Sequence, residues 1–194
     1  MVSAIGSGVT AVKEGDAVAY CSIPGSYAEQ AVVPVDRLIK LPAGLDARAG
    51  AAAMLQGMTA HYLCYATYRV KAGDRVLVHA GAGGVGLLLI QMVKHLGAYI
   101  FSTVSTEAKA ELARAAGADQ VILYTQEDFA KAVNEATNGE GAQVVYDAVG
   151  QTTFDQSLRC LARRGYMVLY GAASGAPPPV DPRILANGSL FLTR

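Results

Sequence analysis

The stretch HAGAGGVGLLLIQMVKHLG, residues 79–97, holds the spacing in this sequence that points most directly to chemistry. Gly81, Gly83 and Gly86 fit the pattern GxGxxG, after a β-branched run and before an apolar run of helical length. In that setting the first glycine allows a tight turn, the second lets a pyrophosphate approach the backbone, and the third lets helix and strand pack closely. Free backbone N–H groups and the helix dipole would face the phosphates. The spacing therefore predicts a dinucleotide-binding turn, although the glycines alone would also fit a turn without a ligand.

The residues about 20 positions further on indicate which dinucleotide is bound, because an NAD site places Asp or Glu there to bind the ribose 2′-hydroxyl. Here the chain reads STEAK, in which Ser105 and Thr106 offer hydroxyls and Lys109 offers a positive charge, followed by Arg114. Hydroxyls and cations suit a 2′-phosphate. Glu107 is the competing residue for an NAD site, but the helix dipole explains a carboxylate in a first turn equally well. The pattern favours NADPH over NADH.

Other catalytic chemistry has weaker support in the sequence. Zinc needs Cys, His or carboxylate ligands that converge in a tetrahedron, and no such spacing is present. A GxSxG nucleophile turn is also missing. His61 and His79 lie near the presumed cleft, where either could donate a proton, but for His79 we expect a structural role with hydrogen bonds to the backbone. Asp147, in the run YDAVG, is expected to anchor the loop that follows it.

The elements that must position these residues follow a regular alternation after Gly73. Short apolar runs alternate with longer helical runs, which is typical of a parallel sheet flanked by helices. Each short run is apolar on both faces, as a strand covered on both sides should be. We expect strands at 75–80, 98–104, 120–124, 142–148, 166–171 and 189–194, and helices at about 84–96, 106–116, 127–137 and 152–163. The predicted fold class is α/β, a doubly wound parallel six-stranded Rossmann sheet with strand order 3-2-1-4-5-6.

The beginning of the chain has a different pattern. Residues 15–20, 25–34 and 37–42 are typical of short strands interrupted by glycine and proline, with no helix between them. A segment compatible with a helix then runs from Asp46 to about Tyr68. We therefore expect residues 1–50 to form part of a β-rich domain, residues 51–72 a bridging helix, and residues 73–194 the dinucleotide-binding domain.

The amino-acid composition limits the classes of partner that we expect the chain to bind. The chain is 52% hydrophobic and 16% charged, with a formal net charge of zero. This balance argues against a protein that binds nucleic acid or a membrane through charge. The three cysteines are odd in number and widely spaced, as expected for reduced thiols in the cytoplasm. No apolar run reaches the roughly 18 residues of a membrane span, and the first residues lack the pattern of a signal peptide.

Several blocks occur in a characteristic order over essentially the whole chain: KEGDAVAY, GSYAEQAVVP, LQGMTAHYL, VLVHAGAGGVGLLLIQMVKHLGA, STEAK, GADQVILY, VVYDAVG and GYMVLYGAASG. On these blocks the chain resembles the zinc-independent quinone oxidoreductases, the zeta-crystallin-like branch of the medium-chain dehydrogenase/reductases. The resemblance implies a GroES-like catalytic domain in front of the Rossmann domain, with NADPH in the cleft between them. It also implies hydride transfer from NADPH to quinones or other electron-poor enones.

The resemblance further implies the residues that contact the cofactor, whereas it implies no catalytic side chain and no metal ligand. Leu55 occupies the position that matches the third catalytic zinc ligand of related alcohol dehydrogenases. The implied contacts are Tyr62 in the bridging helix; Gly81, Gly83, Gly84, Val85 and Gly86 at the pyrophosphate; Ser105 and Lys109 at the 2′-phosphate; Tyr124 near the adenine; and Val149, Tyr170, Gly171, Ala172, Ala173, Thr193 and Arg194 on the nicotinamide side.

Two departures from the family pattern leave the function open. The family has further segments before this start, which supply the nicotinamide and substrate face, and after the last strand, so the resemblance implies an internal fragment or a truncated form. An NADPH-dependent quinone reductase and an NADPH-binding module or sensor without turnover are both compatible with this. RNA binding, which some relatives show, is disfavoured by the zero net charge. The last strand, at the sheet edge, is expected to pair with its copy in a homodimer.

Overall fold

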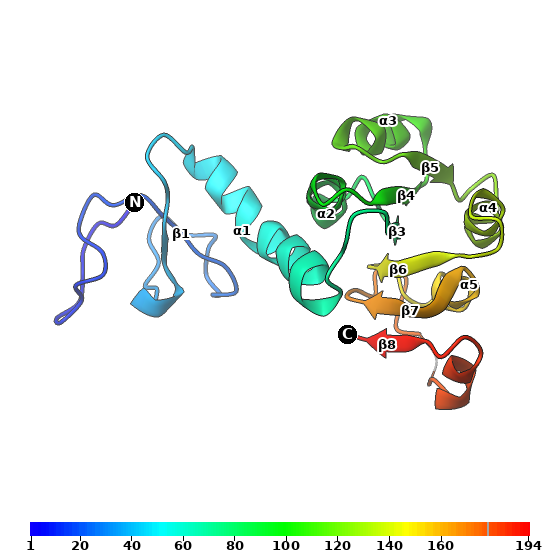
Figure 1. Cartoon of the computed structure of the whole chain (residues 1–194). Coiled ribbons are helices and arrows are strands. Elements are labelled where there is room, and N and C mark those ends of the chain that lie inside the picture. Colours follow the sequence, from blue (N-terminus) through cyan, green and yellow to red (C-terminus); the bar gives the residue numbers. More distant parts are fainter. Residues whose placement is uncertain (178) are drawn as a thin grey trace. The chain divides into compact units, whose positions relative to one another are not determined.

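The computed structural model describes residues 1–177 and 179–194 (Figure 1). The chain forms two compact units, Met1–Met58 and Thr59–Arg194, and the division falls inside a helix. The three-part division expected from the sequence stays a prediction.

The first unit contains little regular structure. Its elements are β1 (Val18–Ala19), η1 (Val35–Arg37), β2 (Ile39–Lys40) and the first part of α1 (Ala47–Tyr62), with β1 and β2 paired antiparallel. The strand predicted at 25–34 is wrong, because this segment has no strand structure and the side chains of Tyr27 and Val32 are almost fully exposed. An extended segment needs partners for its backbone N–H and C=O groups. Within the described residues no strand pairs with residues 25–34.

The second unit is built on a parallel sheet of six strands. These are β3 (Arg75–Val78), β4 (Tyr99–Val104), β5 (Gln120–Leu123), β6 (Ala142–Asp147), β7 (Leu161–Leu169) and β8 (Phe191–Thr193). Their order is β5-β4-β3-β6-β7-β8, and every neighbouring pair is parallel. This is the predicted order, so the doubly wound fold class is confirmed. The order reverses beside β3, where ligands bind in sheets of this kind.

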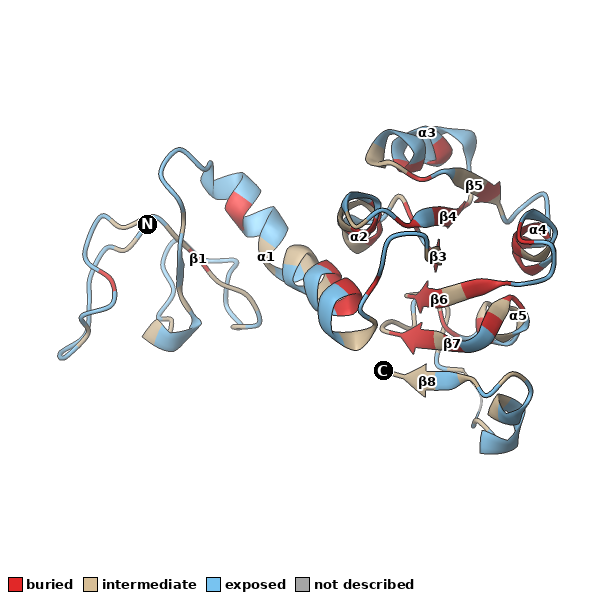
Figure 2. Ribbon diagram, viewed as in Figure 1, coloured by how far each residue is buried: buried red, intermediate tan, exposed pale blue. Residues whose placement is uncertain are grey.

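Helices cover both faces of the sheet because side chains alternate along each strand. Val76 and Val78 pack in one core cluster with residues of α2 and α3, whereas Leu77 packs with Phe129 of α4 and Phe154 of α5 in another. Figure 1 shows α2 on one side of the sheet and α4 and α5 on the other. Figure 2 shows that β6 and β7 are mostly buried and that β8 is more open. The helices of this unit are the π-helical η2 (Leu63–Thr67), α2 (Gly84–His95), α3 (Glu107–Ala116), α4 (Phe129–Ala136), α5 (Phe154–Arg159) and η3 (Pro182–Ala186).

One pair of boundaries differs clearly from the prediction. The helix expected at 152–163 ends at Arg159, and β7 begins at Leu161, well before the expected start at 166. Leu161 pairs with Ala142 of β6, and the register then shifts. A side chain at Gly165 would lie 2.8 Å from the carbonyl oxygen of Ala162, so the strand is sharply bent there. The expected helix therefore ends early because β7 already pairs with β6 at Leu161. The bend at Gly165 makes this strand hard to recognise from the sequence.

Candidate dinucleotide site

The carboxyl ends of the strands border one cavity of about 980 Å³. Its lining comes from the segments after β3, β4, β5, β6 and β7, on both sides of the point where the strand order reverses. Ligands of doubly wound sheets bind in this crevice, and the volume lies at the upper end of the range for small-molecule and cofactor sites. Six of the predicted site residues line it: Gly83, Ser105, Lys109, Tyr124, Val149 and Ala173.

The glycine turn after β3 is packed too closely to accept side chains at two of its positions. A Cβ at Gly86 would lie 2.5 Å from the carbonyl oxygen of Ala80 and 2.8 Å from the Cα of Gly81. A Cβ at Gly81 would lie 1.8 Å from the Oγ of Ser102 in β4. The N–H of Gly81 donates to the carbonyl of Thr103 at 3.1 Å, which ties the turn to the end of β4. These contacts give the third glycine the close packing expected from the sequence, and they also pack the first glycine against β4.

The second glycine lies at the start of α2 and is exposed. Gly83 is the N-cap of this helix and Gly84 its first residue, and no side chain caps the helix. The first amide groups of a helix have no partner within it, so an anion can accept their hydrogen bonds. Ala80 has φ of 51°, a left-handed conformation that is uncommon for a residue with a side chain. The turn therefore combines close packing, local strain and an open helix start beside the cavity.

The end of β4 brings the predicted 2′-phosphate residues together. Lys109 Nζ donates to Ser105 Oγ at 3.1 Å, and both residues line the cavity. Thr106 is the N-cap of α3 and accepts a hydrogen bond from the backbone N–H of Lys109. Glu107 and Arg114 form an ion pair with each other on the exposed side of α3, and neither lines the cavity. Of the residues weighed from the sequence, Ser105 and Lys109 are the two that the fold directs to this site.

The loop after β6 is held by Asp147, as predicted. One oxygen of its buried carboxylate accepts from the N–H groups of Val149 (2.7 Å) and Gly150 (2.9 Å), and the other accepts from Thr153 Oγ1 (2.7 Å). Ser174, after β7, donates through its hydroxyl to the carbonyl of Val149 at 2.8 Å. The loops after β6 and β7 are therefore bonded to each other where they border the cavity.

The remaining predicted residues lie outside this cavity lining, and their contact with a cofactor stays a prediction. Burial raises the pKa of Tyr170, with further contributions from Asp147 and Tyr62, so these three residues are electrostatic neighbours. Gly171 packs against the backbone of Ala148, where a Cβ would lie 2.6 Å from the carbonyl oxygen. The set outside the lining is Tyr62, Gly81, Gly84, Val85, Gly86, Tyr170, Gly171, Ala172, Thr193 and Arg194.

His79 is completely buried at the end of β3. Its Nδ1 lies 2.8 Å from Thr103 Oγ1 and its Nε2 lies 2.9 Å from Ser157 Oγ, so the prediction that the ring bonds the backbone is wrong and its partners are two hydroxyls. The edge of the ring packs on Phe129, with the ring centroids 4.7 Å apart. Burial lowers the pKa of His79 to about 4, although the charge of Asp147 opposes this shift. The ring is therefore neutral near pH 7 and is not positioned as a cationic proton donor.

Several polar residues that line the cavity were missed in the sequence. Thr103 belongs to the predicted strand 98–104, and its place near the carboxyl end of that strand was a usable signal. Thr153 and Gln156 reach the cavity from the loop before α5 and from α5 itself. Nothing in their sequence context marked them as residues of the cavity.

Comparison with known proteins places this chain in a family. Residues 84–192 match the family model described as zinc-binding dehydrogenase. The chain is 45% identical to 2-haloacrylate reductase of a Burkholderia species and 46% identical to a quinone oxidoreductase of Pseudomonas aeruginosa. Each match includes 100% of this chain and 60% of the relative. The chain therefore spans about 60% of the length of the curated relatives that it matches.

A solved structure agrees with these relatives. The crystal structure of Escherichia coli quinone oxidoreductase complexed with NADPH superimposes with a TM-score of 0.95 at 45% identity. The superposition covers 99% of this chain and 60% of that one. No helix in the described part of the chain is both long and apolar enough to cross a membrane.

Proposed function

Because this chain belongs to the zinc-binding dehydrogenase family, we propose that it carries the NADPH site of a zinc-independent reductase that passes a hydride to quinones or other electron-poor enones. The observation that carries the proposal is the cavity in which the glycine turn, Ser105 and Lys109 meet at the carboxyl edge of the sheet. The match to quinone oxidoreductase and 2-haloacrylate reductase sequences over the whole chain supports the substrate class.

Each part of the cavity has a distinct task in this proposal. The open start of α2 at Gly83 binds the pyrophosphate. Ser105 and Lys109 bind the 2′-phosphate, and the half-exposed ring of Tyr124 packs against the adenine. Val149 and Ala173 border the nicotinamide side, where Tyr170, Gly171, Ala172, Thr193 and Arg194 complete the proposed set. Tyr62, the last residue of α1, contacts the cofactor from that helix in this proposal.

The proposed hydride transfer needs little chemical participation by protein side chains. NADPH supplies a hydride when it is bound. The protein orients the reacting groups and excludes water from them, and a quinone oxygen can take its proton from solvent. The neutral, buried ring of His79 is consistent with this division, because it is bonded to two hydroxyls and has no free nitrogen for a substrate.

A metal is not part of the proposal, in spite of the name of the family. Among residues 1–177 and 179–194, no three His, Cys, Asp or Glu side chains lie together where they could hold an ion. The residues present therefore do not fit a zinc site, and we derive no step through one.

The test compares the two nicotinamide cofactors. NADPH and NADH are titrated while nicotinamide fluorescence is followed, with Lys109→Ala as the variant and Lys131→Ala as the matched control. Lys131 is an exposed lysine of α4 outside this cavity. Loss of a charged hydrogen bond should raise the Kd for NADPH about 10- to 100-fold and that for NADH about twofold or less. Equal losses for both cofactors would show that Lys109 does not bind the 2′-phosphate.

A binding module without turnover is the second candidate. Half of the residues that line the cavity come from the end of β4 and the segments after β4 and β5, on the proposed adenosine side, whereas Val149 and Ala173 are the predicted nicotinamide-side residues within it. Adding a naphthoquinone to the NADPH complex separates the two candidates. Loss of absorbance at the nicotinamide band supports the reductase, and tight binding without oxidation supports the module.

We also propose a homodimer and a cytoplasmic location. β8 pairs with β7 on one side, and within the described residues no strand pairs with its other edge. Phe191 of β8 is 41% exposed and stacks on Tyr166 of β7, so the edge is apolar and ordered. A second copy could add its own β8 there. The free thiols, with Cys64 and Cys160 both buried, support a reducing compartment.

A further inference from the structure

A buried polar chain crosses the sheet at the point where the strand order reverses. It starts at Thr103 of β4, passes through His79 at the end of β3 with distances of 2.8 and 2.9 Å, and reaches Ser157 of α5. Ser157 Oγ lies 3.5 Å from Asp147 Oδ2 at the end of β6. Thr103 is 2% exposed and the other three residues are 0% exposed. Four buried polar side chains from four elements therefore bond to one another beside the cavity.

One assignment of donors and acceptors satisfies all the hydrogen bonds among these groups. The Asp147 carboxylate accepts from the Ser157 hydroxyl, so the Ser157 oxygen is free to accept from His79 Nε2–H. The other ring nitrogen, Nδ1, then accepts from the Thr103 hydroxyl. A neutral imidazole in a single tautomer meets all these requirements, and an aliphatic side chain does not.

The two ends of this chain belong to different halves of the cavity. Thr103 precedes Ser105, whose side chain bonds Lys109, and this is the proposed adenosine half. Asp147 holds the N–H groups of Val149 and Gly150 in the loop that borders the proposed nicotinamide half. His79 is the group that joins them, with one nitrogen bonded toward each half.

We propose that His79 is a positioning residue that fixes the spacing between the two halves of the dinucleotide cavity, acting through Ser157 and Asp147 on the loop at Val149. The inference rests on the proposed function in assuming that NADPH lies across both halves. A ligand that spans two halves is bound tightly only when both are held in register, because otherwise binding must also order the site. A ligand that occupies one half does not have this requirement.

The test uses ligands that occupy the whole cavity or one half of it. Ser157→Ala is the main variant, because Ser157 does not line the cavity and can affect a ligand only through its neighbours. The Kd values of NADPH, by fluorescence, and of 2′,5′-ADP, by calorimetry, are measured with the whole chain. We expect about tenfold weaker binding of NADPH and a change within about twofold for 2′,5′-ADP, as for loss of one buried hydrogen bond that acts on alignment.

Two variants of His79 add a rescue experiment. His79→Leu keeps most of the volume and removes both hydrogen bonds, so it should weaken NADPH at least as much as Ser157→Ala. His79→Gln places an amide near the position of Nε2, within reach of Ser157 Oγ, and should recover most of the affinity that His79→Leu loses. Failure of glutamine to recover any affinity would contradict the role of the bond to Ser157.

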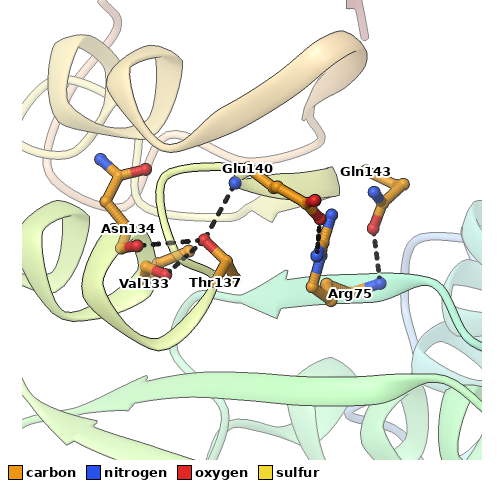
Figure 3. Close-up of polar contacts among 7 residues, drawn as sticks. Arg75, Val133, Asn134, Thr137, Glu140 and Gln143 are labelled. Carbon is orange, nitrogen blue, oxygen red and sulfur yellow. Dashed lines mark hydrogen bonds and ion pairs between the residues drawn. The ribbon is translucent and has the colours of Figure 1, made fainter.

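The matched control is a buried hydroxyl at the opposite edge of the sheet. Thr137 Oγ1 donates to the carbonyl of Val133 at 2.8 Å and accepts from the N–H of Gly141 at 2.9 Å, next to the start of β6 (Figure 3). Thr137→Val removes similar bonds far along the strands from the cavity, so it should lower stability without changing either Kd.

The outcomes separate this inference from the proposed function. If the unsubstituted chain does not bind NADPH, the proposed function fails before the variants are compared. If it binds NADPH and Ser157→Ala behaves like Thr137→Val, the inference fails and the proposed function stands. Equal weakening of NADPH and 2′,5′-ADP by Ser157→Ala would also overturn it, because the damage would then be confined to the adenosine half.

Discussion

Lowering the pH should destabilise the fold through His79. The pKa of this ring falls from its ordinary value of 6.5 to about 4 in the folded chain, because burial disfavours the charged form. Between these two values the unfolded chain binds a proton that the folded chain does not, so stability falls as the pH falls and the loss is complete below about pH 4. Each tenfold change in proton affinity corresponds to about 1.4 kcal/mol, so the loss is about 3 kcal/mol. Asp147, the charged group that acts on this ring, opposes the fall in pKa and is already included in it.

The measurement is urea unfolding at several pH values from 7 to 4, for the unsubstituted chain and for His79→Leu. Carboxylates titrate in both proteins, so the informative quantity is the difference between their free energies of unfolding. His79→Leu should be the less stable protein at pH 7, because it leaves the hydroxyls of Thr103 and Ser157 without their partner. The difference should shrink by about 3 kcal/mol by pH 4.

The control is His95→Gln, at an exposed histidine near the end of α2. Its side chain is exposed and its loss leaves the buried hydroxyls of Thr103 and Ser157 bonded to His79, so this variant should follow the unsubstituted protein across the pH range. A difference between the unsubstituted chain and His79→Leu that stays constant from pH 7 to 4 would refute the reasoning, because it would mean that the buried ring does not resist protonation.

Three further predictions concern the turn, the sheet edge and the metal. Gly86→Ala should cost about 3 kcal/mol or more in urea unfolding, because its Cβ would lie 2.5 Å from the carbonyl oxygen of Ala80. Gly83→Ala, whose Cβ would lie 3.1 Å from the same oxygen, should cost less stability and should weaken NADPH binding. Equal stability losses would contradict this. Phe191→Glu should convert a dimer to a monomer in light scattering, and an unchanged mass would exclude the β8 edge. Dialysis against a zinc chelator should leave NADPH binding and oxidation unchanged, and loss that zinc restores would contradict a metal-free site.

The sheet was predictable from the apolar residues of its strands and from the glycine spacing that follows β3. Val76, Leu77 and Val78 are all apolar, which predicts a strand covered on both faces. The structure buries Val76 and Val78 in one cluster and Leu77 in the other. The glycine spacing then identified the end of that strand. Strand order followed from general rules for parallel sheets, so it needed no further detail from the sequence.

The errors came from places where tertiary pairing overrides local pattern. Residues 25–34 have the composition of a short strand between a glycine and a proline but no partner strand among the described residues, so they remain irregular. Leu161 looks like part of the end of a helix, yet it pairs with Ala142 of β6. In both cases the deciding hydrogen bonds are made or missed with residues distant in the sequence, which a local pattern does not contain.

The geometry of α3 bears on the choice between NADPH and NADH, for which the sequence favoured NADPH. Glu107 and Arg114 are two turns apart on α3, so they share a face and neutralise each other. Ser105 lies just before the N-cap of α3 and accepts a hydrogen bond from Lys109 in its first turn, and both residues line the cavity. A carboxylate that is already paired, outside the cavity, is poorly placed to accept hydrogen bonds from a ribose. The sequence pattern already favoured Lys109 over Glu107, and the placement of the two side chains on α3 supports the lysine and therefore a phosphorylated ribose.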